Sequence, residues 1–115
     1  LKGIVRHRNK SQSLVDVAPE IEAILRIAPT DSTILGYRGW IRFQQRRFEE
    51  GFEDYSIAAE LGDAYSQLQL GQRLYFGMPP TVGPNQEQGL SWIRKAADQG
   101  NEAARNFLVQ AGEKK

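Results

Sequence analysis

Cysteine is absent from the 115 residues of this chain, and histidine occurs once, as His7. Without cysteine the chain has no disulfide framework, no thiolate nucleophile and no zinc site with cysteine ligands. Long apolar runs are also lacking: no segment approaches the roughly 20 residues that span a bilayer, and no signal-peptide pattern is visible. Neither absence decides the compartment, so cytoplasm and bacterial periplasm both stay open. Because the sequence begins with Leu1 rather than Met, we expect a processed product or a fragment.

Sequence features of an enzyme are scarce as well. No Gly-x-Ser-x-Gly and no glycine-rich phosphate loop occurs, and His7 lies in a basic arm (residues 1–13), so a Ser-His-Asp triad lacks its base. Residues 48–63 hold six acids and no basic residue, but no histidine accompanies them as a metal ligand. Since they share a helix with Phe52, Tyr55 and Ala59, we interpret them as its solvated face. We therefore expect no enzyme, cofactor or metal site. The six acids are Glu49, Glu50, Glu53, Asp54, Glu60 and Asp63.

The balance of charge is close to neutral, with a net charge of +1. No global field therefore draws the chain to nucleic acid or to a membrane. The composition, 40% hydrophobic and 25% charged, is that of a folded soluble domain.

Apolar residues recur at helical spacing along most of the chain, and no segment shows strand alternation flanked by hairpin turns. Pro19 suits the first turn of the first helix, and Asn85 with Gln88 resembles a capping box. The pattern predicts an all-α protein of about six helices joined mostly by short turns. We expect the first helix within residues 14–28, with Pro19 in its first turn, and the others at 32–45, 48–61, 64–76, 85–99 and 102–111, followed by a tail at 112–115.

An internal repeat links two of the predicted helices. GFEDYSIAAELG (51–62) and GLSWIRKAADQG (89–100) are offset by 38 residues and share their glycines and their Ala-Ala pair. In each, the opening glycine, the large residue four positions on and the first alanine fall on one helix face, where small residues allow another helix to approach. The closing glycine supplies the left-handed residue that ends a helix. A period of this length predicts stacked helical hairpins.

Residues 62–104 resemble a Sel1-like repeat. LGQRLYFG (70–77), the loop from Val82 to Asn85 and GLSWIRKAADQGNEAA (89–104) carry the resemblance. The chain departs from that family's pattern at Gly89, where alanine is usual, and by two extra residues between Gly77 and Val82. The matching residues are Ala64, Leu70, Gly71, Tyr75, Gly77, Val82, Asn85, Leu90, Trp92, Lys95, Ala96, Ala97 and Gly100.

The preceding unit is similar to a tetratricopeptide-type hairpin through Gly39, Phe48, Gly51, Tyr55 and Ala58. The two resemblances imply one repeat domain over residues 14–111, arranged as a right-handed superhelix of antiparallel hairpins. Its units would be a partial hairpin (14–29), a tetratricopeptide-like unit (30–62), a Sel1-like unit (63–100) and a terminal helix (101–111). The residues expected to set the helix packing are Gly51, Ala58, Ala59, Gly62, Leu70, Gly71, Gly77, Gly89, Trp92, Ala96, Ala97 and Gly100.

In the resembled families the first helices of the hairpins line a concave surface. We therefore expect a protein–protein interaction module that presents such a surface to a protein or peptide partner through aromatic and arginine side chains. The residues expected to bind the partner are Arg38, Trp40, Arg42, Phe43, Arg46, Tyr65, Gln72, Tyr75 and Phe76.

Several alternatives stay open. The stripe of Arg38, Arg42 and Arg46 is also interpreted as a solvated edge paired with Glu49, Glu50 or Glu53 of the next helix. The chain is alternatively a regulatory or accessory domain of a larger enzyme or assembly, or a nucleic-acid-binding helical repeat. The apolar segment from Phe107 to Val109 also allows self-association through the terminal helix.

Overall fold

A computed structural model of the protein describes residues 10–77 and 83–112, with side chains from Pro19 onward. The described residues form six α-helices and no strand, which confirms the all-α prediction. The predicted arm is described only from Lys10, and the tail only at Gly112. The helices are α2 (Lys10–Ile27), α3 (Ser32–Gln44), α4 (Phe48–Glu60), α5 (Ala64–Phe76), α6 (Gln86–Asp98) and α7 (Glu102–Gln110).

Short polar side chains begin four of these helices. Asp31, Asp63, Asn85 and Asn101 each accept a hydrogen bond from the backbone N–H three residues later, at 2.8–3.1 Å. Such a cap satisfies one of the free N–H groups at a helix N-terminus. The chain leaves α4 and α6 through Gly62 and Gly100, whose φ values of 104° and 94° favour glycine. Local chemistry therefore places most helix boundaries within a residue or two of the predicted ones.

Helix α2 differs from the prediction. It begins at Lys10, inside the predicted arm, and Pro19 lies in its interior rather than in its first turn. Proline removes one backbone donor wherever it lies in a helix. The prediction treated this missing donor as a start signal, but the helix continues on both sides of it.

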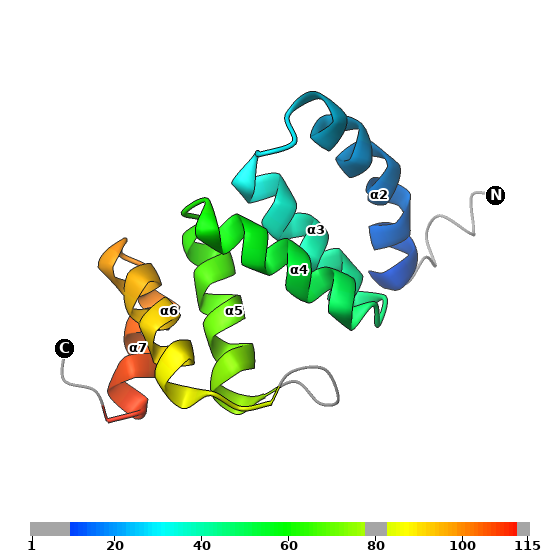
Figure 1. The fold of residues 1–115 in the computed structure, drawn as a ribbon. Helices are drawn as coiled ribbons and strands as arrows, with labels where there is room; N and C mark the ends of the chain where they lie inside the picture. The colour runs from blue at the N-terminus through cyan, green and yellow to red at the C-terminus, as the bar shows by residue number, and fades with distance from the viewer. Residues whose placement is uncertain (1–9, 78–82, 113–115) are drawn as a thin grey trace.

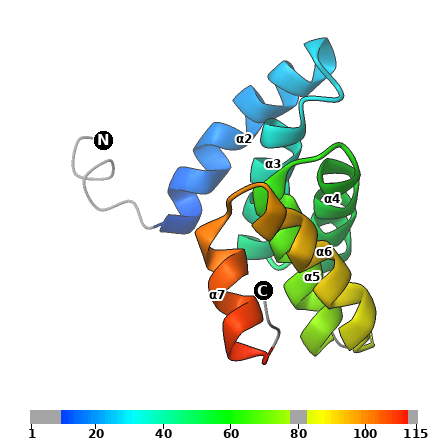
Figure 2. The ribbon, with the colours of Figure 1, turned by 90° about the vertical axis from the view of Figure 1, so that its left-hand side faces the viewer.

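The helices pack against one another in chain order (Figure 1), with the closest pairings in the two hairpins α3–α4 and α5–α6. Helix α2 lies against α3, and α7 lies against α6, so the two hairpins are flanked by one helix on each side. Figure 2, turned by 90°, shows α2 inclined along α3. The molecule is elongated, measuring 53 × 30 × 27 Å.

In each hairpin, the backbones of the two helices come into contact at a pair of glycines. A Cβ on Gly51 would lie 2.9 Å from the Gly39 carbonyl oxygen, and a Cβ on Gly89 would lie 2.6 Å from that of Gly71. Four residues after Gly51 and Gly89, Tyr55 in the first hairpin and Ile93 in the second are fully buried. The repeated spacing of glycine and large residue thus has the same packing consequence in both hairpins.

Three groups of buried side chains make up the core. One joins α2 to the first hairpin, one joins the first hairpin to α5, and one joins α5, α6 and α7. Trp40 packs against the first two groups, while Trp92 is half-buried against the second, with the Lys95 ammonium 4.5 Å from its ring centre. The alanines at 58, 59, 96, 97 and 104 are buried, which allows the close approach of the helices.

Candidate functional site

A groove of about 430 Å³ lies between α3 and the beginning of α5. Its volume falls within the range of small-ligand pockets. Most of its lining is apolar, and α3 supplies four of the side chains from one face, at positions 33, 34, 37 and 40. The lining residues are Thr33, Ile34, Tyr37, Trp40, Asp63 and Tyr65.

Three aromatic rings line the groove, two from α3 and one from α5. Tyr37 and Trp40 lie one helical turn apart, with ring centres 5.8 Å apart and planes only 8° from parallel. Tyr65 comes from α5 and meets the buried ring of Tyr55 edge-on at 6.1 Å. Tyr37 and Tyr65 are each 40% exposed, so large aromatic side chains remain open to a partner on both sides of the groove.

Asp63 is the charged residue of the groove and also the cap of α5. Its Oδ2 accepts hydrogen bonds from the Ser66 backbone N (2.9 Å) and the Ser66 hydroxyl (2.6 Å). On α3, a Cβ at Gly36 would overlap the Ser66 hydroxyl oxygen and would lie 3.1 Å from Asp63 Oδ2. The absence of a side chain at Gly36 therefore makes room for the Ser66 hydroxyl and for the carboxylate that accepts its hydrogen bond.

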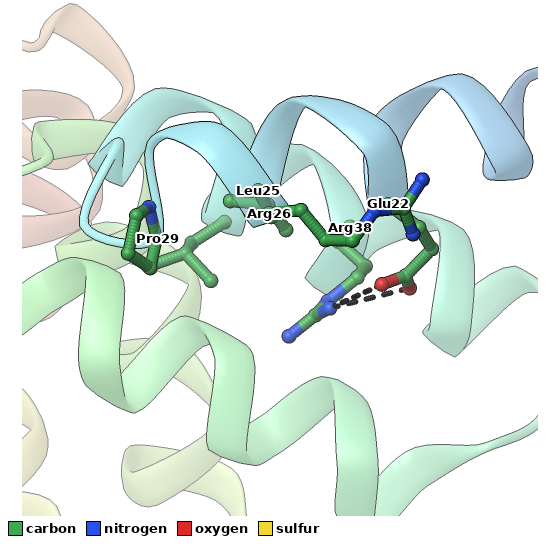
Figure 3. A pocket seen from close by; sticks show the side chains of 6 residues that line it. Glu22, Leu25, Arg26, Pro29 and Arg38 are labelled. Carbon is green, nitrogen blue, oxygen red and sulfur yellow. Dashed lines mark hydrogen bonds and ion pairs between the residues drawn. The ribbon is translucent and has the colours of Figure 1, made fainter.

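Arg38 and Arg42 lie on the opposite side of α3 and are engaged by two acids. Arg38 donates to both carboxylate oxygens of Asp54, each at 3.0 Å, and Arg42 donates to Asp54 Oδ2 at 2.9 Å. Arg38 also donates to both oxygens of Glu22 on α2, as Figure 3 shows. The hydrogen bonds with Asp54 raise the pKa of Arg38, while burial opposes this shift.

This arrangement corrects two predictions. Asp54 is 1% exposed, so it is not part of a solvated acidic face. Arg38 and Arg42 pair with Asp54 and Glu22 rather than with Glu49, Glu50 or Glu53. Arg47, which follows this stripe in the sequence, pairs with exposed Glu50. The reason is that α4 directs buried Asp54 toward α3, and that α2, the helix before α3, supplies the second acid.

The ion-pair network occupies the positions at which the second hairpin has apolar residues. Counted from the caps Asp31 and Asp63, Arg38 corresponds to Leu70, and Arg42 corresponds to Leu74. Counted from Gly51 and Gly89, Asp54 corresponds to Trp92. Leu70, Leu74 and Trp92 belong to or pack against one apolar group. The two hairpins thus use the same backbone positions for a charged core and for an apolar core.

A second pocket, of about 250 Å³, lies beside this network between α2 and α3 (Figure 3). It contains groups of both signs, since Glu22, Arg26 and Arg38 all line it. The Glu22 carboxylate already holds Arg38 there. Two of its three charged side chains are therefore bonded to each other, which makes this pocket a weaker candidate for a binding site than the aromatic groove. Its remaining lining residues are Leu25, Pro29 and Leu35.

Phe43 is half-buried and covered by the protein itself. Its ring stacks on Tyr55 at 5.3 Å, and the Arg73 guanidinium of α5 lies 4.4 Å from its centre. Arg73 also donates to Gln69 at 2.8 Å. Phe43 is therefore part of the joint between α3, α4 and α5, and its open surface is limited.

Tyr75 and Phe76 lie at the far end of α5, in a cluster with Phe107 of α7. The three rings meet edge-on at centre distances of 5.0–5.9 Å. Phe76 is 66% exposed and Val109 is 70% exposed, while Leu108 is buried. This apolar end is separate from the groove lining. Of the remaining expected partner-binding residues, Arg46 is exposed and ends α3 with φ of 65°, and Gln72 is half-buried.

The structure thus brings together two of the nine expected partner-binding residues, Trp40 and Tyr65, in one groove. Sequence reasoning missed Tyr37, Ile34 and Asp63 as members of this site. Tyr37 had a usable signal, because it lies three positions before Trp40 and therefore on the same helix face. For Asp63 the sequence contained no such signal, because the position of its carboxylate against α3 depends on Gly36 of that helix.

Within the described residues, no group of three or more histidine, cysteine or acidic side chains is placed to hold a metal ion. In the same part of the chain, no helix combines the length and apolarity needed to cross a membrane. Comparison of the chain with models of protein families, with curated proteins and with solved structures gives no match.

Proposed function

We propose that this chain is a helical-repeat module that binds a protein or peptide partner in the groove between α3 and α5. The observation that carries the proposal is the groove itself: about 430 Å³, largely apolar, with Tyr37 and Tyr65 both 40% exposed. Aromatic anchors in such a concave site are the residues on which protein recognition most often depends. Since the aromatic rings come from two packed helices, binding would cost little ordering of the protein.

The repeat part of the proposal is that the chain is a Sel1-like and tetratricopeptide-like array, with its hairpins stacked as a right-handed superhelix. It is supported by the two glycine-closed hairpins and by their packing in chain order. Asp31, Asp63 and Asn101 cap α3, α5 and α7, the first helices of the proposed units, in the same way, and Asn85 caps α6 likewise. In such an array, α3 and α5 are neighbouring first helices, and the groove lies on the surface that the resembled families use for partners.

A peptide selection with structural mapping tests the proposal. Peptides selected on the immobilised chain from a random library are titrated into the ¹⁵N-labelled protein. We expect the largest chemical-shift changes at Tyr37, Trp40 and Tyr65. Tyr37→Ala and Tyr65→Ala should each weaken binding at least about fivefold, as expected of anchor residues.

Ile57→Ala is the matched control. Ile57 is 42% exposed on α4 and does not line the groove, so its removal also deletes an exposed apolar side chain. We expect its effect on affinity to stay within about twofold. Circular dichroism confirms that each variant is folded. Selected peptides whose footprint lies elsewhere, or that bind Tyr37→Ala and Tyr65→Ala as tightly as the wild type, would contradict the proposal.

A further inference from the structure

The groove combines aromatic rings with one acid and no base. Among the described residues that line it, Asp63 is the single charged side chain, and no lysine or arginine is present. The faces of aromatic rings carry a negative quadrupole and attract cations. The groove is therefore complementary to a ligand that is apolar in part and positively charged at one point.

Half of the Asp63 carboxylate is available to such a ligand. Both hydrogen bonds that cap α5 go to Oδ2, and Oδ1 accepts none from the described residues. The cap does not require a charge at this position, because Asn101 caps α7 with a neutral side chain at 2.8 Å. The negative charge in the groove is thus additional to what the fold needs there.

Elsewhere in the protein, cations lie over two aromatic rings. The Arg73 guanidinium lies 4.4 Å from the ring centre of Phe43, and the Lys95 ammonium lies 4.5 Å from that of Trp92. In the described part of the chain, no cation covers Tyr37, Trp40 or Tyr65. Tyr37 and Tyr65, each 40% exposed, therefore present aromatic surface in the same groove as a carboxylate.

We infer that the groove receives an arginine side chain of its partner, with an apolar residue beside it. The guanidinium lies against the aromatic rings and donates to Asp63 Oδ1, while the apolar residue packs on Ile34 and Tyr37. Arginine fits better than lysine because its planar guanidinium stacks on a ring and still presents a fork of donors to a carboxylate. This inference rests on the proposed peptide-binding function and names the chemistry of the partner.

Four peptides and two variants test it. The probes are Ac-Ala-Leu-Arg-Leu-Ala-NH₂ and its citrulline, lysine and leucine counterparts at the central position, titrated into ¹⁵N-labelled protein. Citrulline keeps the shape of arginine without its charge. We expect the arginine peptide to bind at least about fivefold more tightly than the citrulline peptide, with shifts at Trp40 and Tyr65, and the difference to shrink in high salt.

Asp63→Asn keeps a capping oxygen for α5 but removes the charge, so it should abolish the preference for arginine over citrulline. Asp31→Asn makes the same change at the cap of α3, outside the groove lining, and should preserve the preference. Equal binding of the arginine and citrulline peptides to the wild type overturns the inference, as does a lysine peptide that binds as tightly as the arginine peptide. Loss of the preference in Asp31→Asn overturns it too.

The outcome separates this inference from the proposed function. If the leucine peptide binds as tightly as the arginine peptide, and Tyr65→Ala weakens both, the groove does not select arginine. The proposal that it binds peptides is then still supported. If none of the four peptides perturbs the groove, the arginine inference falls. The proposed function then fails as well if the peptides selected on the whole chain also bind elsewhere.

Discussion

Gly71 and Gly89 hold α5 and α6 in backbone contact. A Cβ on Gly89 would lie 2.6 Å from the carbonyl oxygen of Gly71 and 2.7 Å from the backbone nitrogen of Tyr75. A Cβ on Gly71 would in turn lie 2.7 Å from the carbonyl oxygen of Gly89. Each glycine thus leaves the space that the other helix's backbone occupies, and the separation of the two helices depends on both.

Gly89→Ala should therefore destabilise the protein although alanine favours helices. The gain in helix propensity is about 1 kcal/mol. The new methyl group meets backbone atoms, which cannot rotate away, so the helices must separate at a net cost of about 1–3 kcal/mol. Urea unfolding followed by circular dichroism measures the difference.

Ser91→Ala is the control for that experiment, since Ser91 is exposed on the same helix. It should leave the free energy of unfolding unchanged or raise it by a few tenths of a kcal/mol. A Gly89→Ala protein that is as stable as the wild type would show that α5 and α6 do not need this contact.

Removal of Asp54 should be among the costliest single changes. Asp54→Ala leaves Arg38 and Arg42 without their shared partner in a mostly buried place, where their side chains are 21% and 17% exposed. Breaking a buried ion pair on one side typically costs about 3–5 kcal/mol. Thermal and urea unfolding should both show this loss of stability. Glu53→Ala, at an exposed neighbouring position, is the control and should change the free energy of unfolding by less than about 0.5 kcal/mol.

The apolar residues of the second hairpin suggest a rescue of that variant. The triple variant Arg38→Leu, Arg42→Leu and Asp54→Trp places in the first hairpin the residues that correspond to Leu70, Leu74 and Trp92. A buried ion network is often replaced by apolar residues at little cost. We expect the triple variant to be more stable than Asp54→Ala alone. A less stable triple variant would mean that the first hairpin lacks room for an apolar core.

Tyr55 should make stability fall at high pH. An unperturbed tyrosine loses its proton near pH 10, and burial raises the pKa of Tyr55 in the folded protein. The unfolded chain therefore releases this proton first, so the stabilisation is complete below about pH 10 and is lost as the pH rises further. Urea titrations from about pH 8 to pH 11 should show this loss.

The variant Tyr55→Phe isolates that effect. Its unfolding free energy should fall less steeply above about pH 10 than that of the wild type. At neutral pH the variant should be neutral or slightly stabilising, because the Tyr55 hydroxyl is buried without a hydrogen-bond partner among the described residues. An equally steep decline in both proteins would remove Tyr55 as its cause.

Gln99 should link the two hairpins. Its side-chain amide donates to the Gly62 carbonyl oxygen at 2.9 Å and to Gln67 Oε1 at 3.0 Å. Gln99→Ala leaves the Oε1 of buried Gln67 without this donor. The free energy of unfolding should therefore fall by about 0.5–1.5 kcal/mol. Gln110→Ala, which removes an exposed glutamine from α7, should cost less than about 0.5 kcal/mol. Equal unfolding midpoints for the two variants would contradict the linking role.

Local chemistry explains why the helices were predictable. Asp31, Asp63, Asn85 and Asn101 start helices by capping their own neighbouring N–H groups, an interaction that spans three residues of sequence. Helix α5 has the predicted bounds, and α3, α4 and α7 end one residue short of theirs. Pro19 misled the prediction because its local preference for a first turn was weaker than the tendency of the surrounding segment to be helical.

The candidate site was less predictable because its members meet across helices. Trp40 and Tyr65 were expected to face a partner, but their common groove exists only because the fold brings the beginning of α5 to one face of α3. Likewise, no spacing along the chain relates Glu22 to Arg38, or distinguishes buried Asp54 from exposed Glu53 one residue before it.

The sequence by itself determined the helices and the contact faces of the repeated segments, since caps, glycine turns and apolar periodicity act within a few residues. Only the tertiary structure decided which charges are buried and which aromatic rings stay open. Those outcomes depend on the side chains that neighbouring helices bring to the same place. Asp54 is enclosed by arginines of α3, whereas Asp63 has an oxygen, Oδ1, that no described residue bonds, and lines the groove with the aromatic rings.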